Sequence, residues 1–190
     1  MITLLRHGEI KGGKRFRGST DDPLTPKGLD QMRTATKDPF TCDLVISSPL
    51  MRCASFASEL SDKKSLPLLL EPRFTEMHFG DWEGRTSKQI YDEAPKALEQ
   101  FWNDPQKHPP PGGERLLDFR ARVLAAFAEL LEHHKDQHLL LVTHGGVIRI
   151  LQCHMQNISL YKILELEVGY GARTTFKRKV DGQFVRLEQN

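Results

Sequence analysis

Two histidines of this chain each stand close behind a short apolar run. Residues 2–5 are followed directly by Arg6 and His7, and the apolar run of residues 139–142 ends two residues before His144. In open α/β sheets, ligands bind beyond the carboxyl ends of the strands. The two runs therefore predict one pocket that holds two imidazoles, and the arginine beside His7 indicates that the ligand is an anion.

A third apolar run points to the same pocket. Residues 44–46 have the composition of a short buried strand, and Pro49 is typical of the first residue of a helix that runs to about Leu60. Arg52 then lies in the first turn of this helix, where free N–H groups and the helix dipole favour an anion. We expect Arg6 and Arg52 to clamp one phosphate from two directions, because a guanidinium forms paired hydrogen bonds with phosphate oxygens.

The chemistry that follows from this pocket is phosphoryl transfer through a histidine. Two nearby arginines disfavour the protonated imidazole, so we expect His7 to be neutral and to form a phosphohistidine. We expect His144 to donate a hydrogen bond to the phosphoryl oxygens. A leaving alkoxide also needs a proton, and residues 71–85, a segment without a clear period, offer three carboxylic acids. They are Glu76, Asp81 and Glu83, and spacing alone does not choose among them.

These side chains need a scaffold in which apolar strands alternate with helices. The pattern predicts helices over residues 26 to about 35 with Thr25 as the cap, 49 to about 60, 87–93, 96–103, 114–134 and 146–155. It predicts strands over residues 2–5, 44–46, 68–70, 139–142, 164–168, 173–180 and 184–187. The alternation predicts an α/β fold, a three-layer α/β/α sandwich with a mostly parallel central sheet, in one domain over residues 1–190.

Five segments of the chain form a pattern when they are taken in order. They are Arg6-His7-Gly8-Glu9, Pro23-Leu24-Thr25-Pro26-Lys27-Gly28, Ser47-Ser48-Pro49-Leu50-Met51-Arg52, Glu76 with Phe79-Gly80-Asp81-Trp82-Glu83-Gly84, and Thr143-His144-Gly145-Gly146. As a set they resemble the histidine phosphatase superfamily, in the branch that includes cofactor-dependent phosphoglycerate mutase. The resemblance covers residues 2 to about 150 and implies a phosphoglycerate mutase-like fold.

The resemblance assigns roles to residues of this sequence. It implies that His7 is the phosphorylated nucleophile and that Glu76 is the proton donor, with no metal or other cofactor. It also implies that Arg6, Arg52 and His144 complete the phosphate pocket.

The resemblance also bears on the substrate, a small-molecule phosphate ester. The short chain and residues 79–84 are most similar to α-ribazole phosphatases, which act in the assembly of the cobalamin nucleotide loop. This similarity implies α-ribazole 5′-phosphate as the substrate. A broad-specificity phosphatase of sugars or other organic phosphates and a mutase-like enzyme remain alternatives, although mutases of this branch are longer.

The sequence departs from the family pattern just beyond the first histidine. The family usually has an asparagine six residues after the nucleophile, and this chain has Gly13 there. A backbone N–H at Gly13 or the charge of Lys14, Arg15 or Arg17 are the candidate replacements. Residues 15–18, which end in Gly18, otherwise resemble the substrate loop of the family. The basic run of residues 11–17 is equally well explained as a solvated loop or as a substrate-steering loop.

Composition limits the partners. The net charge is +2 and 27% of the residues are charged, which gives no reason to expect a nucleic-acid partner. No apolar run is long enough to span a membrane, and a candidate site at residue 6 leaves no room for a signal peptide. The three cysteines have no metal-ligand spacing, so we expect a cytoplasmic protein. The terminal strands would permit a homodimer.

Other phosphate-handling classes agree less well with the sequence. Gly8, Gly13 and Lys14 have P-loop spacing, but Arg15 replaces the magnesium-binding hydroxyl of an NTPase. A cysteine phosphatase needs an arginine six residues after its cysteine, and positions 48, 59 and 159 are Ser, Glu and Ser. No two aspartates lie two residues apart, which excludes the aspartyl-phosphate type. A non-catalytic phosphate-binding module remains as the alternative of a different class.

Overall fold

The computed structural model describes residues 1–37 and 39–187, and the strands in this part of the chain form one six-stranded sheet. The strands are β1 (Ile2–Arg6), β2 (Leu44–Ser47), β3 (Leu68–Leu70), β4 (Leu139–Thr143), β5 (Arg173–Arg178) and β6 (Phe184–Leu187). Their order across the sheet is β3-β2-β4-β1-β5-β6. The first four strands in this order run parallel, and β5 and β6 each run antiparallel to the preceding strand. The predicted α/β class with a mostly parallel sheet is confirmed.

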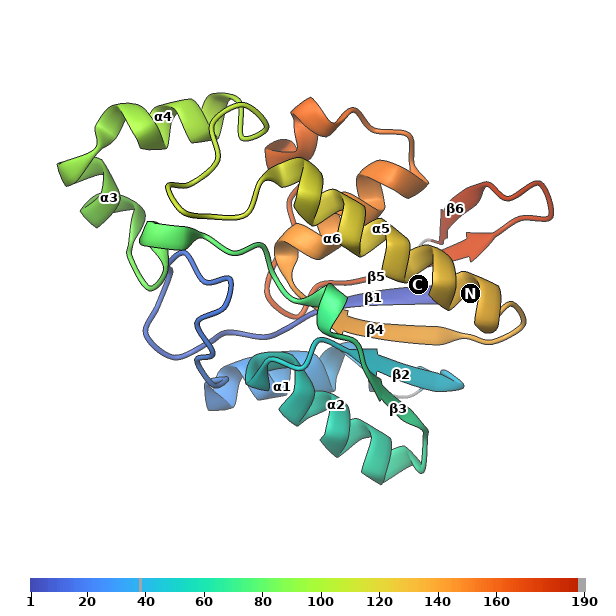
Figure 1. Ribbon diagram of the computed structural model, residues 1–190. Coiled ribbons are helices and arrows are strands. Elements are labelled where there is room, and N and C mark those ends of the chain that lie inside the picture. The colour runs from blue at the N-terminus through green and yellow to red at the C-terminus, as the bar shows by residue number, and fades with distance from the viewer. Residues whose placement is uncertain (38, 188–190) are drawn as a thin grey trace.

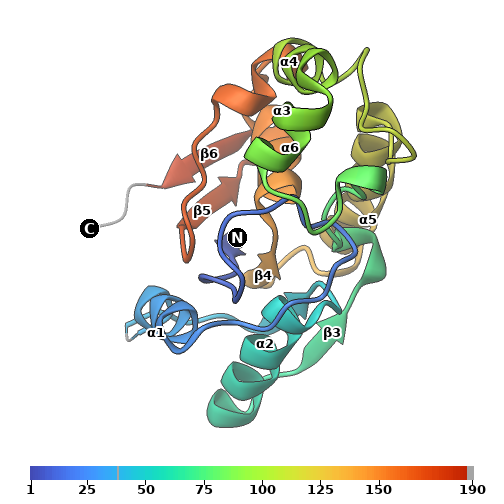
Figure 2. The same ribbon diagram turned by 90° about the vertical axis from the view of Figure 1, so that its left-hand side faces the viewer.

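Helices cover both faces of this sheet. The α-helices of the described residues are α1 (Pro26–Ala35), α2 (Met51–Lys64), α3 (Ser87–Glu93), α4 (Pro95–Asn103), α5 (Leu116–His133) and α6 (Gly145–Met155). Figure 1 shows α1 and α2 below the sheet and α5 and α6 above it, which gives the three predicted layers. The short helices α3 and α4 lie beyond the carboxyl ends of the parallel strands, the end that faces the viewer in Figure 2. The single domain over residues 1–190 stays a prediction, and residues 38 and 188–190 lie outside the described residues.

The continuous apolar runs of the central strands follow from burial on both faces. Leu4 of β1 and Leu141 of β4 belong to the core under α5 and α6. Their neighbours Leu5 and Leu140 belong to the core under α1 and α2. All four side chains are fully buried. A strand that is covered on both faces has no polar position to alternate with, so its sequence reads as an unbroken apolar run.

Local signals set the start of α1 as predicted. Pro26 is the first residue of this helix, where its missing N–H costs no hydrogen bond. The hydroxyl of Thr25 accepts a hydrogen bond from the N–H of Gly28 at 2.9 Å, which caps the helix.

The start of α2 differs from the prediction by two residues. The helix begins at Met51, after Leu50 in extended backbone (φ −63°, ψ 137°), so Pro49 precedes the helix instead of opening it. No side chain caps this end. Arg52 still lies in the first turn, as expected.

The strand predicted over residues 164–168 is wrong. Residues Leu160–Glu165 form a 3-10 helix, and the chain then continues without regular structure to β5. The sheet position beside β1 is occupied by β5, with Ile2 opposite Phe176. The carbonyl groups of Leu166 and Val168 therefore accept hydrogen bonds from arginine side chains instead of a strand. The apolar spacing in this segment reflects Ile163 and Val168, which are buried in the core.

The predicted irregular segment, residues 71–85, contains two single turns of 3-10 helix. They are Pro72–Phe74 and Gly80–Trp82. Phe74 and Trp82 are both buried in the same hydrophobic core, so two aromatic side chains fix the segment. This holds Glu76, which lies between them, at a defined place near the sheet.

Candidate active site

A cavity of about 640 Å³ lies beyond the carboxyl end of β1. Six of the residues predicted for the site or the substrate loop line it: Arg6, His7, Arg15, Arg17, Arg52 and Glu76. Other walls come from Phe79, Trp102, Arg149 and Tyr170. A second cavity of about 700 Å³ between α1, α6 and β5 contains none of the predicted site residues. Of the side chains predicted at the strand ends, Arg6, His7 and Arg52 line this cavity, whereas His144 does not.

His7 is held as a neutral ring with a fixed tautomer. Its side chain is 4% exposed, and Nδ1 lies 2.8 Å from the carbonyl oxygen of Gly8. A carbonyl oxygen only accepts hydrogen bonds, so Nδ1 carries the proton and Nε2 carries the lone pair. Burial, with a smaller contribution from the positive charges of Arg6 and Arg52, lowers the pKa of His7 to about 3, although the hydrogen bond with Gly8 acts in the opposite direction. An unprotonated Nε2 is the form that attacks phosphorus.

Arg6, the last residue of β1, keeps donors for a ligand. Its Nη1 donates to the carbonyl of Val168, and its guanidinium lies 4.3 Å from the ring centre of Tyr170. Its Nε is buried and has no hydrogen-bond partner among the described residues. Burial lowers the pKa of Arg6 below its usual value. An unpartnered buried donor beside His7 has the character of an anion site.

Arg52 lies at the base of the cavity, but most of its donors face the protein. The side chain is 1% exposed. Its Nη1 donates to the carbonyl of Thr20 at 2.6 Å, and its Nη2 donates to the carbonyls of Gly18 at 2.9 Å and Arg17 at 3.4 Å. Its Nε donates to Nδ1 of His144 at 3.2 Å. Of the five N–H groups of a guanidinium, one on Nη1 is left for a ligand.

His144 is next to His7 but does not line the cavity. The strands that precede the two histidines are paired in register, with Arg6 opposite Thr143, and the two rings meet edge to face at 5.3 Å. His144 is fully buried, and its Nδ1 accepts from Arg52. Its Nε2 therefore carries the proton and donates to Oγ of Ser48 at 2.7 Å. Burial and the charge of Arg52 hold the pKa of His144 well below its usual value.

The three candidate acids lie in different surroundings. Glu76 is the one that lines the cavity, whereas Asp81 is exposed and Glu83 faces the backbone of residues 18–20. Oε1 of Glu76 accepts from the N–H of Met77 at 3.0 Å, and Oε2 accepts from the N–H of Gly146 at 2.9 Å. A Cβ atom at Gly146 would lie 2.2 Å from Oε1, so the carboxylate needs a glycine at this end of α6.

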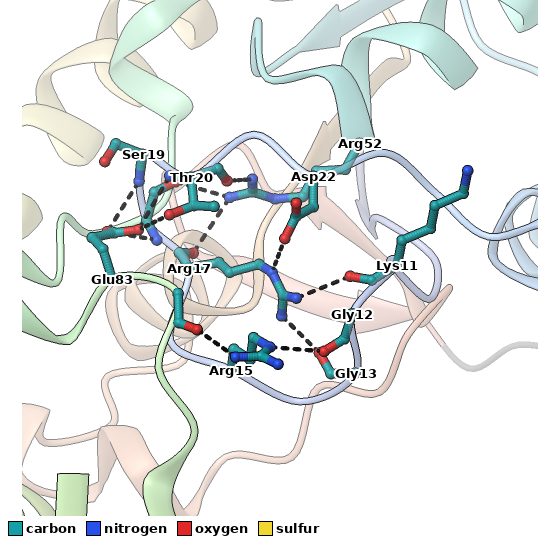
Figure 3. Close-up of polar contacts among 12 residues, drawn as sticks. Lys11, Gly12, Gly13, Arg15, Arg17, Ser19, Thr20, Asp22, Arg52 and Glu83 are labelled. Atoms are coloured by element: carbon teal, nitrogen blue, oxygen red, sulfur yellow. Dashed lines mark hydrogen bonds and ion pairs between the residues drawn. The ribbon is translucent and has the colours of Figure 1, made fainter. Parts of the chain in front are cut away.

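The loop of residues 11–22 is tied by its own arginines (Figure 3). The buried side chain of Arg17 pairs with Asp22 at 2.5 Å and donates to the carbonyls of Gly13 and Lys11. Arg15 donates to the carbonyls of Gly12 and Gly84. Gly13 contributes its carbonyl and a positive φ of 72°, and does not line the cavity. The basic run is thus an ordered wall of the site, and the side chain of Lys14 also lines the cavity.

Sequence reasoning missed Arg149 and Tyr170. Arg149 lies one helical turn after Gly145, on the same side of α6, a spacing that would have indicated it. Its Nε donates to the carbonyl of Leu166, and its two Nη groups have no partner among the described residues. Tyr170 lies between two glycines in a segment without periodicity, which gave no signal.

Positive charge dominates the walls of the cavity. Among its lining residues Glu76 is the single carboxylate, against six cationic side chains. They are Arg6, Lys14, Arg15, Arg17, Arg52 and Arg149. Such a site attracts a multiply charged anion. No group of three or more His, Cys, Asp or Glu side chains with the geometry of a metal site occurs in residues 1–37 and 39–187.

Comparison with known proteins agrees with this geometry. The family model described as histidine phosphatase superfamily (branch 1) matches residues 2–190. The chain belongs to the histidine phosphatase superfamily. This membership, together with phosphatase-named relatives, makes the protein an enzyme of the phosphatase type. In the described part of the chain, no helix is both long and apolar enough to span a membrane.

Relatives within this superfamily carry different substrate names. Adenosylcobalamin/alpha-ribazole phosphatase of Escherichia coli is 32% identical over 154 residues, 79% of this chain and 76% of that protein. Glucosyl-3-phosphoglycerate phosphatase of Mycolicibacterium vanbaalenii is 32% identical over 164 residues, 79% of this chain and 71% of that protein. The structure of alpha-ribazole phosphatase from Shigella flexneri superposes with a TM-score of 0.87 at 27% identity, covering 98% of this chain and 94% of that chain. The predicted phosphoglycerate mutase-like histidine phosphatase fold is confirmed.

Proposed function

We propose that this histidine phosphatase is a metal-independent phosphomonoester hydrolase that works through a phosphohistidine. The observation that carries the proposal is the tautomer of His7, whose Nε2 lone pair is free in a cavity that also holds Arg6 and Glu76. Nε2 of His7 attacks phosphorus in line, and the bond from phosphorus to the ester oxygen breaks. Glu76 gives its proton to the leaving oxygen. Water then attacks phosphorus, its proton passes to the carboxylate of Glu76, and the bond from phosphorus to Nε2 breaks to release inorganic phosphate.

The arginines stabilise the charge on the transferred phosphoryl group. Arg6 offers its unpartnered Nε, and Arg52 offers its remaining Nη1 N–H. In the free enzyme, His144 positions Arg52 through Nδ1. We assign to His144 a second role, donation from Nε2 to a phosphoryl oxygen when its hydrogen bond with Ser48 opens.

Glu76 has to carry a proton when it acts as the acid. Two backbone N–H groups donate to it, and one of them belongs to the N-terminal end of α6. An arriving phosphate dianion brings a second negative charge into the cavity, and a proton shared with Glu76 relieves the repulsion between the two groups. We therefore propose that the acid is formed in the substrate complex, when phosphate and Glu76 share the cavity.

As the substrate we propose first α-ribazole 5′-phosphate, a small-molecule phosphate ester. A sequence relative and a solved structure that are both named as α-ribazole phosphatases support this choice. The rings of Phe79, Trp102 and Tyr170 in the cavity wall also offer stacking surfaces for a flat aromatic base. We further propose that the enzyme is cytoplasmic, has no nucleic-acid partner and forms a homodimer through a terminal strand.

A phosphate ester that carries a carboxylate is the second candidate substrate. Its support is Arg149, a half-buried cation in the cavity wall with two free Nη groups and no ion-pair partner among the described residues. An uncompensated cation at this depth favours a ligand with a second negative group. The relative named for glucosyl-3-phosphoglycerate acts on an ester of this kind.

The experiment that tests the proposal is a turnover screen with the purified protein in excess chelator. Release of inorganic phosphate is measured for α-ribazole 5′-phosphate, phosphoglycerates, phosphoserine and neutral sugar phosphates. The highest kcat/KM for the first substrate supports the α-ribazole assignment, and a preference for carboxylated esters supports the second candidate. Loss of activity in chelator contradicts metal independence. Phosphate binding without release from any ester would show a non-catalytic module.

A further inference from the structure

Glu83 is the most heavily bonded carboxylate of the described residues, although it does not line the cavity. Its Oε1 accepts from the N–H groups of Gly18 at 2.9 Å, Ser19 at 3.1 Å and Phe79 at 2.9 Å. Its Oε2 accepts from the N–H of Thr20 at 3.1 Å and from the hydroxyl of Thr20 at 2.6 Å. Burial by itself raises the pKa of Glu83, but these hydrogen bonds outweigh burial and hold the pKa below its usual value. Glu83 is therefore an ionised anchor for the backbone of residues 18–20 (Figure 3).

The other side of the same backbone holds Arg52. In the peptide unit between Arg17 and Gly18, the N–H donates to Glu83 and the C=O accepts from Nη2 of Arg52. In the next peptide unit, between Gly18 and Ser19, the N–H again donates to Glu83 and the C=O again accepts from Nη2 of Arg52. Two consecutive peptide units therefore lie between a carboxylate and a guanidinium, with their dipoles aligned between the two charges.

The carboxylate of Glu83 and the guanidinium of Arg52 thus interact through the two peptide units that lie between them. Hydrogen bonds in a chain polarise one another, so the negative charge at the N–H end strengthens the carbonyl as an acceptor for the guanidinium. These hydrogen bonds require that the backbone at Gly18 packs directly on the carboxylate of Glu83. A Cβ atom at Gly18 would lie 2.6 Å from Oε1 of Glu83 and 2.0 Å from the carbonyl oxygen of Met77, so only glycine is accommodated.

We infer that Glu83 is a positioning residue for phosphate binding, which acts on Arg52 through the peptide units of residues 17–19. Through these carbonyls Glu83 sets the plane of the guanidinium, and with it the direction of the single Nη1 N–H that is left for a ligand. Glu83 itself touches no substrate. The inference rests on the proposed function in one respect, namely that the anion bound beside Arg52 is the phosphoryl group of the substrate.

The first test compares Glu83→Gln with Asp81→Asn by calorimetric titration with inorganic phosphate. An amide keeps the size of the side chain, but loses the charge and turns an NH2 group toward the backbone N–H donors. We expect the Kd for phosphate to rise about tenfold or more in Glu83→Gln, as for loss of a charged hydrogen-bond partner. Asp81→Asn changes an exposed carboxylate of the same loop and should stay within about twofold. A wild-type Kd in folded Glu83→Gln would overturn the inference.

The second test asks whether the effect passes through Arg52. Glu83→Gln is measured again in an Arg52→Lys background, because a lysine does not make the paired contacts of a guanidinium. We expect the second substitution to change the Kd less than about threefold there, which is the non-additivity of coupled residues. Equal fold-changes in both backgrounds would show that Glu83 only folds the loop.

A conservative variant keeps the test decisive if the amide variant does not fold. Glu83→Asp retains the charge but withdraws it by one methylene, so we expect an intermediate rise in the Kd for phosphate. An unchanged Kd would contradict the inference. Phosphate binding is measured without turnover, so a wild-type protein that binds phosphate but releases none from esters would refute the proposed function alone.

Discussion

Nε of Arg52 donates a hydrogen bond to Nδ1 of His144 across 3.2 Å, although the two residues lie 92 positions apart in the chain. Both were expected to contact the phosphate directly. In the folded protein they contact each other, and this bond fixes the proton of His144 on Nε2, where it faces Ser48. Arg52 lines the cavity and His144 does not, so in the free enzyme His144 acts by orienting Arg52, and its own proposed donation to the phosphate requires that its hydrogen bond with Ser48 opens.

Removal of the Arg52 guanidinium in Arg52→Gln is expected to cost about 3 kcal/mol of transition-state stabilisation, which lowers kcat/KM by about a hundredfold. The reason is the loss of a preorganised donor beside the transferred phosphoryl group. Steady-state kinetics on one ester measure the effect. Arg33→Gln is the matched control, because Arg33 is an exposed arginine that pairs with Glu59 away from the cavity. A loss below about fivefold in Arg52→Gln would contradict the role.

Replacement of the nucleophile is expected to abolish the covalent intermediate. His7→Ala removes the Nε2 lone pair, so no phosphoenzyme should form and nearly all turnover should be lost. Rapid quenching with an isotopically labelled ester, followed by alkaline gel analysis, measures the phosphohistidine. His138→Ala, which changes a half-buried histidine at the opposite end of β4, is the matched control. Retained turnover in His7→Ala would refute the mechanism.

The proton donor is tested through the leaving group. Glu76→Gln cannot give a proton, so we expect it to lose about a hundredfold or more on an alkyl phosphate and much less on p-nitrophenyl phosphate, whose leaving group is a weak base. The ratio of kcat between the two esters is the measurement. Equal losses on both esters would assign Glu76 to binding. For the wild type we expect the best turnover at mildly acidic to neutral pH, and an alkaline optimum would contradict the proton donor.

Arg149 is expected to act on substrate choice. Arg149→Met keeps an unbranched apolar stem but removes both free Nη groups from the cavity wall, together with the Nε that donates to Leu166. If the substrate carries a carboxylate, kcat/KM for that ester should fall about tenfold or more, while p-nitrophenyl phosphate changes less than about threefold. An equal loss of kcat/KM for both esters would show that Arg149 contacts the transferred phosphate. No loss of kcat/KM for either ester would favour α-ribazole 5′-phosphate as the substrate.

Acid is expected to destabilise the fold through the buried ring of His7. In the unfolded chain the ring has a pKa near 6.5, whereas the folded protein holds it at about 3. Between these values the unfolded state binds more protons, so the free energy of unfolding falls as the pH falls. At pH 5 His7 alone should account for a loss of about 2 kcal/mol relative to neutral pH. Urea unfolding at both pH values, for wild type and His7→Gln, measures this difference.

The control for this pH effect is His133, an exposed histidine at the end of α5. His133→Gln should keep the wild-type loss of stability in acid, whereas His7→Gln should show a smaller loss. An identical pH dependence in wild type and His7→Gln would contradict the low pKa of His7.

Elements with a local cause were predictable from the sequence. The apolar runs at residues 2–5 and 139–142 became central strands because burial on both faces demands an unbroken apolar sequence. Thr25 and Pro26 opened a helix because their effects act within one turn. The strand predicted over residues 164–168 was wrong because its outcome depended on a distant segment and not on local sequence. Its apolar spacing matches a strand, but the position beside β1 was filled by a segment later in the chain.

What the sequence determined by itself is which residue types stand at the strand ends, and from these types it predicts a histidine nucleophile, an acid and arginines for one phosphate. Only the tertiary structure decided which groups these side chains face. Arg52 turns toward loop carbonyls and His144, and Glu83 bonds the N–H groups of that same loop. The physical reason is that a side chain's type fixes what it is able to donate or accept, whereas its partners depend on backbone groups brought together by contacts between distant segments.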